Sequence, residues 1–257
     1  KATKLQIICY TSKNDIDDIQ SFLTGNNITN VKLKLFELTD FFAHKRIAEI
    51  KEINKNLYAK DNVWEQRCVE LMWLKLFWLY DESVAHKNEK VFWIDAGLSH
   101  AGILPKSLNH HEHANHSYEE SFDNSLAFNE NFVNKIDSHS NGKIFSFYCL
   151  NRQHQYSDYI LQKLGKEQKN PLGGSIVAGL FGGSFEQIES LVKYSMEIIL
   201  DIMNGTSLLQ EELILTLVYQ DHPELFDVYS FQTWYHPDWN CFDKDQIPFC
   251  SFFEGLA

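Results

Sequence analysis

The chain lacks long apolar runs and paired cysteines. Among its 257 residues no apolar run approaches the ~18 residues of a membrane-spanning helix, so we expect no transmembrane segment. Its five cysteines are scattered and form no Cys-x-x-Cys pair, which argues against a disulfide scaffold or a cysteine-rich metal site. This usage is typical of a reducing compartment, and we predict a cytoplasmic protein.

Positive charge is also scarce. The 23 Lys and Arg residues face 35 Asp and Glu residues, which gives a formal net charge of −12. Nucleic-acid binding needs a basic face, so we expect no nucleic-acid partner. A nucleotide needs only a local phosphate site, often with a divalent cation, and the charge does not exclude one. The hydrophobic content of 44% favours a folded chain with a sizeable core.

Short apolar stretches alternate with amphipathic ones along most of the chain. This alternation predicts an α/β sheet with helices on both faces. We find no linker or repeat and predict a single domain over residues 1–257. The expected strands span residues 5–10, 31–36, 91–94, 144–149, 173–183 and 226–229. The expected helices span residues 16–23, 38–54, 62–80, 119–136, 151–164 and 184–204, and a last one begins at 207.

Local signals set the ends of the last two helices. Ser184 and Gln187 have the spacing of a capping box at a helix start. Residues 204–205, Asn-Gly, predict a left-handed cap at the end of that helix. Ser207 predicts the start of the next helix.

The strand at residues 91–94 runs directly into a polar segment. In open α/β sheets, ligands bind beyond the carboxyl ends of the strands, where Asp95 falls. Gly97 leaves room for a ligand beside the backbone. Asp95, Ala96, Gly97 and His100 are therefore candidate binding residues. The alternative is an Asp that caps the following turn.

Two other places combine unusual residues with element ends. Residues 179–183 contain adjacent glycines, Gly182 and Gly183, at a strand-to-helix junction, where a turn would let a ligand lie against the main chain. The alternative is an ordinary tight turn. Glu211 and Glu212 stand near the start of an apolar helix, and compensation of the helix dipole is the alternative to a catalytic role.

Two further features have ordinary explanations. Lys75 on the helix at 62–80 could reach a phosphate, although a solvated lysine is the commoner arrangement. Residues 101–141 are polar and hold four histidines within seven residues, which could bind a metal. Their spacing is irregular and no cysteine accompanies them, so we predict an exposed loop-and-helix insertion there. The four are His110, His111, His113 and His116.

The order of these motifs resembles that of a metal-dependent glycosyltransferase of the GT-A type. More narrowly, the chain looks like the HtrL/YibB and WlaTC group of bacterial glycosyltransferases. The resemblance covers roughly residues 5–239 and implies a Rossmann-like mixed sheet flanked by helices. The carrying segments are 92–100, 179–184, 211–216 and 222–226, and the first two together are the most specific.

The resemblance implies a nucleotide-sugar donor, a divalent cation such as Mn²⁺ or Mg²⁺, and a surface-glycan acceptor of the lipopolysaccharide or capsule type. Asp95 matches the metal-binding Asp of such enzymes, whereas Gly97 replaces the second Asp of the motif. His236 or Asp238 could supply a later ligand. A lipid-linked acceptor would bring the protein to the inner face of the membrane.

The resemblance also implies catalytic roles. Glu212 corresponds to the carboxylate near the anomeric carbon, as a general base in an inverting enzyme or a stabilising or attacking group in a retaining one. Glu211 is its neighbour, and Gly182 and Gly183 would hold a sugar by main-chain contacts. Trp239 could stack on a sugar face, with core packing as an equally good account.

The chain departs from the family in one further respect, and two other functions stay open. Residues 5–10 look like the second strand of such a fold, so we expect the first strand to precede Lys1. One alternative is a nucleotidyltransferase, although the basic glycine-rich loop of that class is not seen. The other is a degenerate, non-catalytic nucleotide- or glycan-binding module, which the missing second Asp favours.

Overall fold

The computed structural model describes residues 6–53, 69–95, 130–150, 174–206 and 208–232. Contacts divide the chain into two compact units, residues 1–74 and 75–257. The predicted mixture of helices and strands is confirmed in both. The expected single domain over residues 1–257 stays a prediction. Most of the predicted insertion at 101–141 lies outside the described residues.

The first unit contains a parallel pair of strands. Strands β1 (Ile7–Thr11) and β2 (Val31–Leu35) are joined through helix α1 (Ile16–Gly25). Their register pairs Ile7 with Val31. These elements confirm the predictions for residues 5–10, 16–23 and 31–36 to within two residues at each described end.

The prediction of one continuous helix over residues 38–54 is wrong, because the segment is interrupted after residue 40. A 3₁₀ turn, η1 (Leu38–Asp40), is followed by a separate helix, α2 (His44–Ile53). Phe41 is extended, with φ −71° and ψ 125°, and its side chain is buried. Burial of this aromatic ring therefore outweighs the helical periodicity of the segment. Lys51 of α2 pairs with Glu70 at 2.8 Å.

Helix α5 (Val69–Ala85) carries the chain from the first unit into the second. The start predicted at residue 62 lies outside the described residues, and the helix continues five residues past the predicted end at 80. Leu76 and Leu79 are buried, and their separation by three positions places them on one face of the helix.

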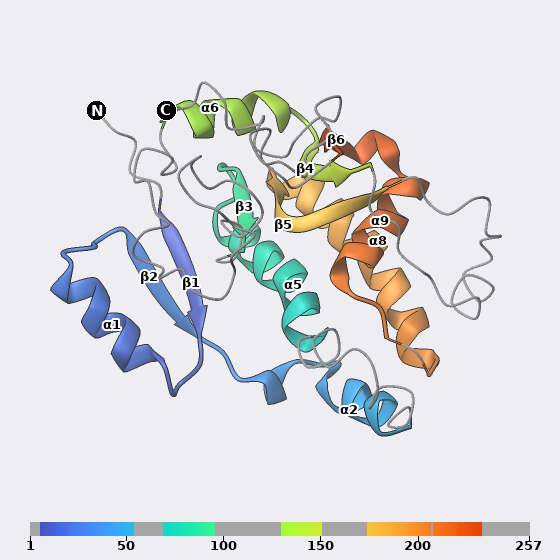
Figure 1. Ribbon diagram of the computed structural model, residues 1–257, viewed down its shortest axis with the longest axis horizontal. Coiled ribbons are helices and arrows are strands. Elements are labelled where there is room, and N and C mark those ends of the chain that lie inside the picture. Colours follow the sequence, from blue (N-terminus) through green and yellow to red (C-terminus); the bar gives the residue numbers. More distant parts are fainter. Residues whose placement is uncertain (1–5, 54–68, 96–129, 151–173, 207, 233–257) are drawn as a thin grey trace, which may run out of the picture. The chain divides into compact units, whose positions relative to one another are not determined.

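The second unit holds a mixed sheet of four described strands. Their order is β3-β5-β4-β6, with β5 antiparallel to β3 and β4, and β4 parallel to β6 (Figure 1). The predicted strands of this unit are confirmed. Their bounds are β3 (Val91–Ile94), β4 (Ile144–Cys149), β5 (Ser175–Gly183) and β6 (Phe226–Phe231).

Helices cover both faces of this sheet, as predicted. They are α6 (Glu130–His139), α8 (Phe185–Asn204) and α9 (Glu211–Asp221); the short 3₁₀ turn η6 (Pro223–Leu225) leads from α9 into β6. Ile136 of α6 joins the core cluster that contains Phe145 and Phe147 of β4. Tyr148 points to the opposite face, because neighbouring strand residues alternate, and its ring contacts Tyr219 of α9.

The helix boundaries are confirmed at one predicted end and corrected at two. Ser184 precedes α8, and its backbone N–H donates to the side-chain oxygen of Gln187 at 3.0 Å, as the capping box predicts. Gly205 follows the helix with φ −98°, so the predicted left-handed cap is wrong. Helix α9 begins at Glu211 with Gln210 as its N-cap, four residues after the predicted start at Ser207.

Candidate functional site

Asp95 lies at the carboxyl end of β3, as predicted. Its backbone N–H donates to the carbonyl oxygen of Gly179 at 2.8 Å. The pairing of β3 with β5 therefore extends one residue beyond Ile94 and fixes the backbone from which the Asp95 side chain projects. Strand β5, which pairs with β3 here, has an irregular register with its other neighbour, β4.

The register between β4 and β5 shifts at this point. Ser146 pairs with Phe181, but the next residue of β4 pairs with Val177, so residues 178–180 have no partner on β4. The hydroxyl of Ser146 donates to the carbonyl oxygens of Val177 and Leu180, both at 3.4 Å. Such a bulge bends a strand and redirects its backbone groups.

Helix α9 takes up the backbone donors that β5 presents beyond the end of β3. Thr216 Oγ1 accepts the N–H of Ile176 at 3.0 Å, and Glu212 Oε1 accepts the N–H of Ala178 at 3.4 Å. Side chains of α9 thus replace a neighbouring strand along this stretch. The first turn of α9, which carries Glu211 and Glu212, is thereby held beside Asp95.

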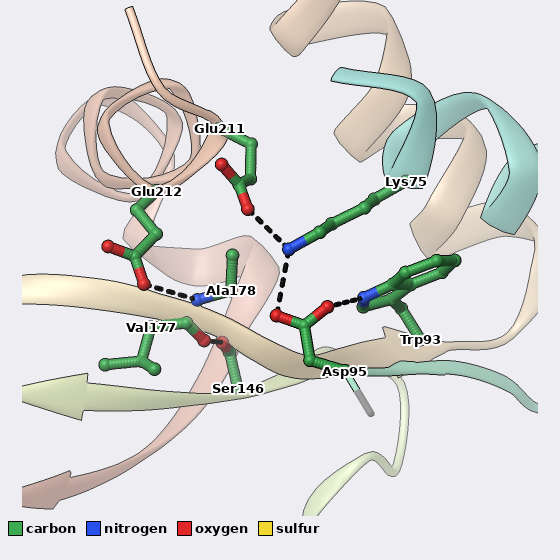
Figure 2. A network of polar contacts seen from close by, with 8 residues as sticks. All are labelled: Lys75, Trp93, Asp95, Ser146, Val177, Ala178, Glu211 and Glu212. Carbon is green, nitrogen blue, oxygen red and sulfur yellow. Dashed lines mark hydrogen bonds and ion pairs between the residues drawn. The ribbon is translucent and has the colours of Figure 1, made fainter. Parts of the chain in front are cut away.

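A lysine joins the two elements. Lys75 of α5 lies between the carboxylates of Asp95 and Glu211 in Figure 2, with its Nζ 2.9 Å from Asp95 Oδ2 and 2.6 Å from Glu211 Oε1. The side-chain exposures of Lys75, Asp95 and Glu211 are 13%, 33% and 4%. The interpretation of Lys75 as a solvated lysine is wrong. Its side chain is largely shielded from solvent, and it bridges two of the predicted site residues.

The charge of Lys75 is set by its surroundings. Burial disfavours the ammonium, but the carboxylates of Glu211 and Asp95 outweigh that effect and raise the pKa of Lys75 above its usual value. The lysine is therefore a fixed positive charge at neutral pH.

Trp93 orients Asp95 from the same strand. Its indole Nε1–H donates to Asp95 Oδ1 at 2.7 Å (Figure 2). The ring of Trp78 on α5 stacks on Trp93 with centroids 5.8 Å apart, which holds the indole in place. Both oxygens of Asp95 therefore accept hydrogen bonds from protein donors.

The two glutamates differ in burial. Glu211 is almost fully buried, and its Oε2 has no hydrogen-bond partner among the described residues. Glu212 is only partly buried and reaches β5 through Oε1. Because Glu211 is enclosed and paired with Lys75, it positions that lysine. Glu212 is the more accessible of the two to a ligand.

The described side chains do not by themselves form a metal centre. Within the described ranges no group of three or more His, Cys, Asp or Glu side chains could hold a metal ion. Asp95 accepts from Lys75 and Trp93, and one oxygen of Glu211 is taken by the same lysine. His236 and Asp238 lie outside the described residues, and the divalent cation stays a prediction.

The predicted glycine turn is wrong. Residues 179–183 lie inside the buried strand β5, where Gly182 pairs with Phe92 and Phe145. A Cβ at Gly182 would lie 2.1 Å from the carbonyl oxygen of Val91. Close strand packing therefore accounts for this glycine, and a sugar contact at Gly182 or Gly183 stays a prediction.

The structure brings four of the predicted site residues together: Lys75, Asp95, Glu211 and Glu212. Of the others, Gly182 and Gly183 lie within β5, and five lie outside the described residues, namely Ala96, Gly97, His100, His236 and Trp239. Sequence analysis missed Trp93 and Thr216. Trp93 resembles an ordinary core residue of a buried strand. Thr216 follows Glu212 by four positions, which places both on one helix face, and that spacing was an available signal.

No helix in the described ranges is both long enough and apolar enough to span a membrane. Comparisons with protein-family models, curated proteins and solved structures give no significant match to this chain.

Proposed function

We propose that the chain is a glycosyltransferase of the GT-A type that moves a sugar from a nucleotide-sugar donor to a surface-glycan acceptor. The observation that carries the proposal is the pairing of Asp95 and Glu211 with the ammonium of Lys75, with Glu212 adjacent on the first turn of α9. The group lies at the carboxyl end of β3, the edge at which open α/β sheets bind ligands.

The chemistry of sugar transfer matches these groups. The leaving group is a nucleoside diphosphate, whose developing negative charge is stabilised by a preorganised cation in a site shielded from water. Lys75 supplies a fixed cation, and its two carboxylate partners prevent it from swinging into solvent. A divalent cation held by ligands other than the two oxygens that Lys75 engages would add to the stabilisation of the leaving group when bound.

A carboxylate is also needed at the reacting carbon. Glu212 is the more accessible glutamate of the α9 first turn, and it is the residue we assign there. In an inverting reaction it would take the proton of the acceptor hydroxyl. In a retaining reaction it would stabilise or attack the oxocarbenium-like centre.

The test begins with thermal shifts. The protein is mixed with UDP-, GDP-, CMP- and dTDP-sugars, each with Mn²⁺ and with EDTA. We expect one nucleotide class to raise the melting temperature and Asp95→Asn to abolish the rise. Asp227→Asn is the matched control, because this aspartate of β6 has a similar exposure of 39%. The absence of a shift with every sugar nucleotide would contradict the proposal.

Turnover then separates the three candidate functions. Release of the nucleoside diphosphate together with sugar transfer supports the transferase. Release of pyrophosphate from a nucleoside triphosphate would instead show a nucleotidyltransferase. Binding without turnover, unchanged in Glu212→Gln, would show a non-catalytic module. Location in the cytoplasm, and at the inner membrane face for a lipid-linked acceptor, belongs to the same proposal.

A further inference from the structure

One ammonium occupies the space between two carboxylates from distant parts of the sequence. Asp95 follows β3, Glu211 begins α9, and Lys75 Nζ lies within 2.9 Å of an oxygen of each. All three side chains belong to the second unit. A positive charge held by two carboxylates is the arrangement that a divalent cation would also require.

Lys75 and a divalent cation would use the same oxygens. The engaged atoms are Asp95 Oδ2 and Glu211 Oε1, while Asp95 Oδ1 accepts the indole N–H of Trp93. A metal ion bound to either engaged oxygen would lie beside the ammonium, and the two positive charges would repel each other in a poorly solvated place. Lys75 must therefore move away before a metal can bridge the two carboxylates.

Lys75 pairs with only one of the two carboxylate oxygens of Glu211. Glu211 is 3% exposed, and among the described residues its Oε2 has no hydrogen-bond partner. A single ammonium pairs with one oxygen of this carboxylate, whereas a metal ion can bind both. Without Lys75, this buried carboxylate would lose the counter-charge that the described residues give it, and such a group binds a cation strongly or becomes protonated.

We propose that Lys75 is the resident cation of this site and that it competes with divalent metal ions for Asp95 and Glu211. In the wild-type protein Lys75 stays bound to both carboxylates, so a metal ion does not bridge them. The part of this inference that concerns the donor rests on the proposed function. There, the diphosphate of a sugar nucleotide contacts Lys75 and binds without a divalent cation.

The direct test measures Mn²⁺ binding by the loss of the free-ion electron paramagnetic resonance signal. The proteins are wild type, Lys75→Met, Lys75→Arg and the double variant Lys75→Met/Glu211→Gln. We expect Lys75→Met to bind one Mn²⁺ at least tenfold more tightly than wild type. Lys75→Arg keeps the charge and should match wild type, and the double variant should lose the gain.

Two results would overturn the proposal. One is a Lys75→Met protein that binds Mn²⁺ no more tightly than wild type. The other is a wild-type protein that binds one Mn²⁺ tightly and loses it in Asp95→Asn. The second measurement needs no Lys75 variant, so it decides the matter even if Lys75→Met fails to fold.

A third measurement addresses the donor. If one sugar nucleotide stabilises the wild-type protein, we expect its dissociation constant to change less than threefold when EDTA replaces Mn²⁺. We also expect Lys75→Met to bind it at least tenfold more weakly in EDTA. Strict metal dependence of wild-type binding would refute the inference about Lys75 and leave the transferase proposal intact, because that proposal depends on transfer itself.

Discussion

Lys75 Nζ and Glu211 Oε1 lie 2.6 Å apart, although 136 positions separate the two residues in the sequence. The neighbouring Glu212 points elsewhere, because successive residues of an α-helix project about 100° apart. One glutamate therefore packs against α5 while the next reaches β5. The two adjacent carboxylates form a natural matched pair for mutation.

Glu211→Gln should lower stability and donor binding, whereas Glu212→Gln should lower turnover. Glu211→Gln removes one of the two charges that hold the largely shielded Lys75, so we expect a loss of about 2 kcal/mol in the free energy of unfolding. We also expect weaker donor binding, because Lys75 loses one of its two anchors.

Glu212→Gln keeps an amide oxygen that can still accept the N–H of Ala178, so stability should change by less than about 0.5 kcal/mol. Turnover should fall by about 10²–10⁴-fold, the range for loss of a general base. Urea unfolding and steady-state kinetics measure both effects. Greater loss of turnover in Glu211→Gln, with donor affinity unchanged, would reverse the assignment.

Gly182→Ala should destabilise the sheet. The new Cβ would lie 2.1 Å from the Val91 carbonyl oxygen and 2.6 Å from the Phe92 Cα, so the strands must separate. We expect a cost of about 1–3 kcal/mol in the free energy of unfolding, as for other overpacked positions. Gly25→Ala is the control, because nothing lies within 4 Å of a Cβ there. Equal melting temperatures for the two variants would contradict the close packing.

The ion pairs of Lys75 should stabilise the fold throughout the neutral range. Its pKa is raised in the folded state, so this stability is fully present below the ordinary lysine pKa of about 10.4 and is lost as the pH rises through the folded value. The difference in unfolding free energy between wild type and Lys75→Met should therefore stay constant from pH 7 to pH 9. A difference that shrank over this interval would mean that the ammonium loses its proton near neutrality.

Thr216→Val should destabilise β5, because it removes the acceptor of the Ile176 N–H. Valine matches the shape of threonine but cannot accept the N–H of Ile176, which would be left buried without a partner. We expect a loss of about 1–3 kcal/mol and faster hydrogen exchange at the Ile176 amide. Thr216→Ser restores the acceptor and should recover most of the protection. Unchanged exchange in the valine variant would show that the backbone finds another acceptor.

Strand periodicity predicted much of the sheet, because each strand carries a short apolar run that the core requires. It also placed Asp95 correctly, since a carboxylate directly after a strand lies at the end of that strand. The turn predicted at Gly182 is wrong, because this residue lies inside β5. Adjacent glycines suit both a turn and a closely packed strand, and only the approach of Val91 decides between them.

Local sequence patterns could not predict the ion pairs of Lys75. A lysine on a helix is usually solvated, and nothing near Lys75 in the sequence indicates the two carboxylates it meets. The start of α9 was misplaced for a related reason. Ser207 has good capping chemistry, yet the helix begins at Glu211, the residue that pairs with Lys75. Tertiary pairing is consistent with that later start.

The capping of β5 by α9 also bears on how the protein can fail. An uncovered strand edge is a template on which another chain can add a strand. Thr216 and Glu212 block that template where β3 ends, over a stretch of β5 whose side chains are all buried. If the start of α9 detached, the exposed strand would recruit a second copy of itself, so self-association into aggregates is the expected result of weakening this helix.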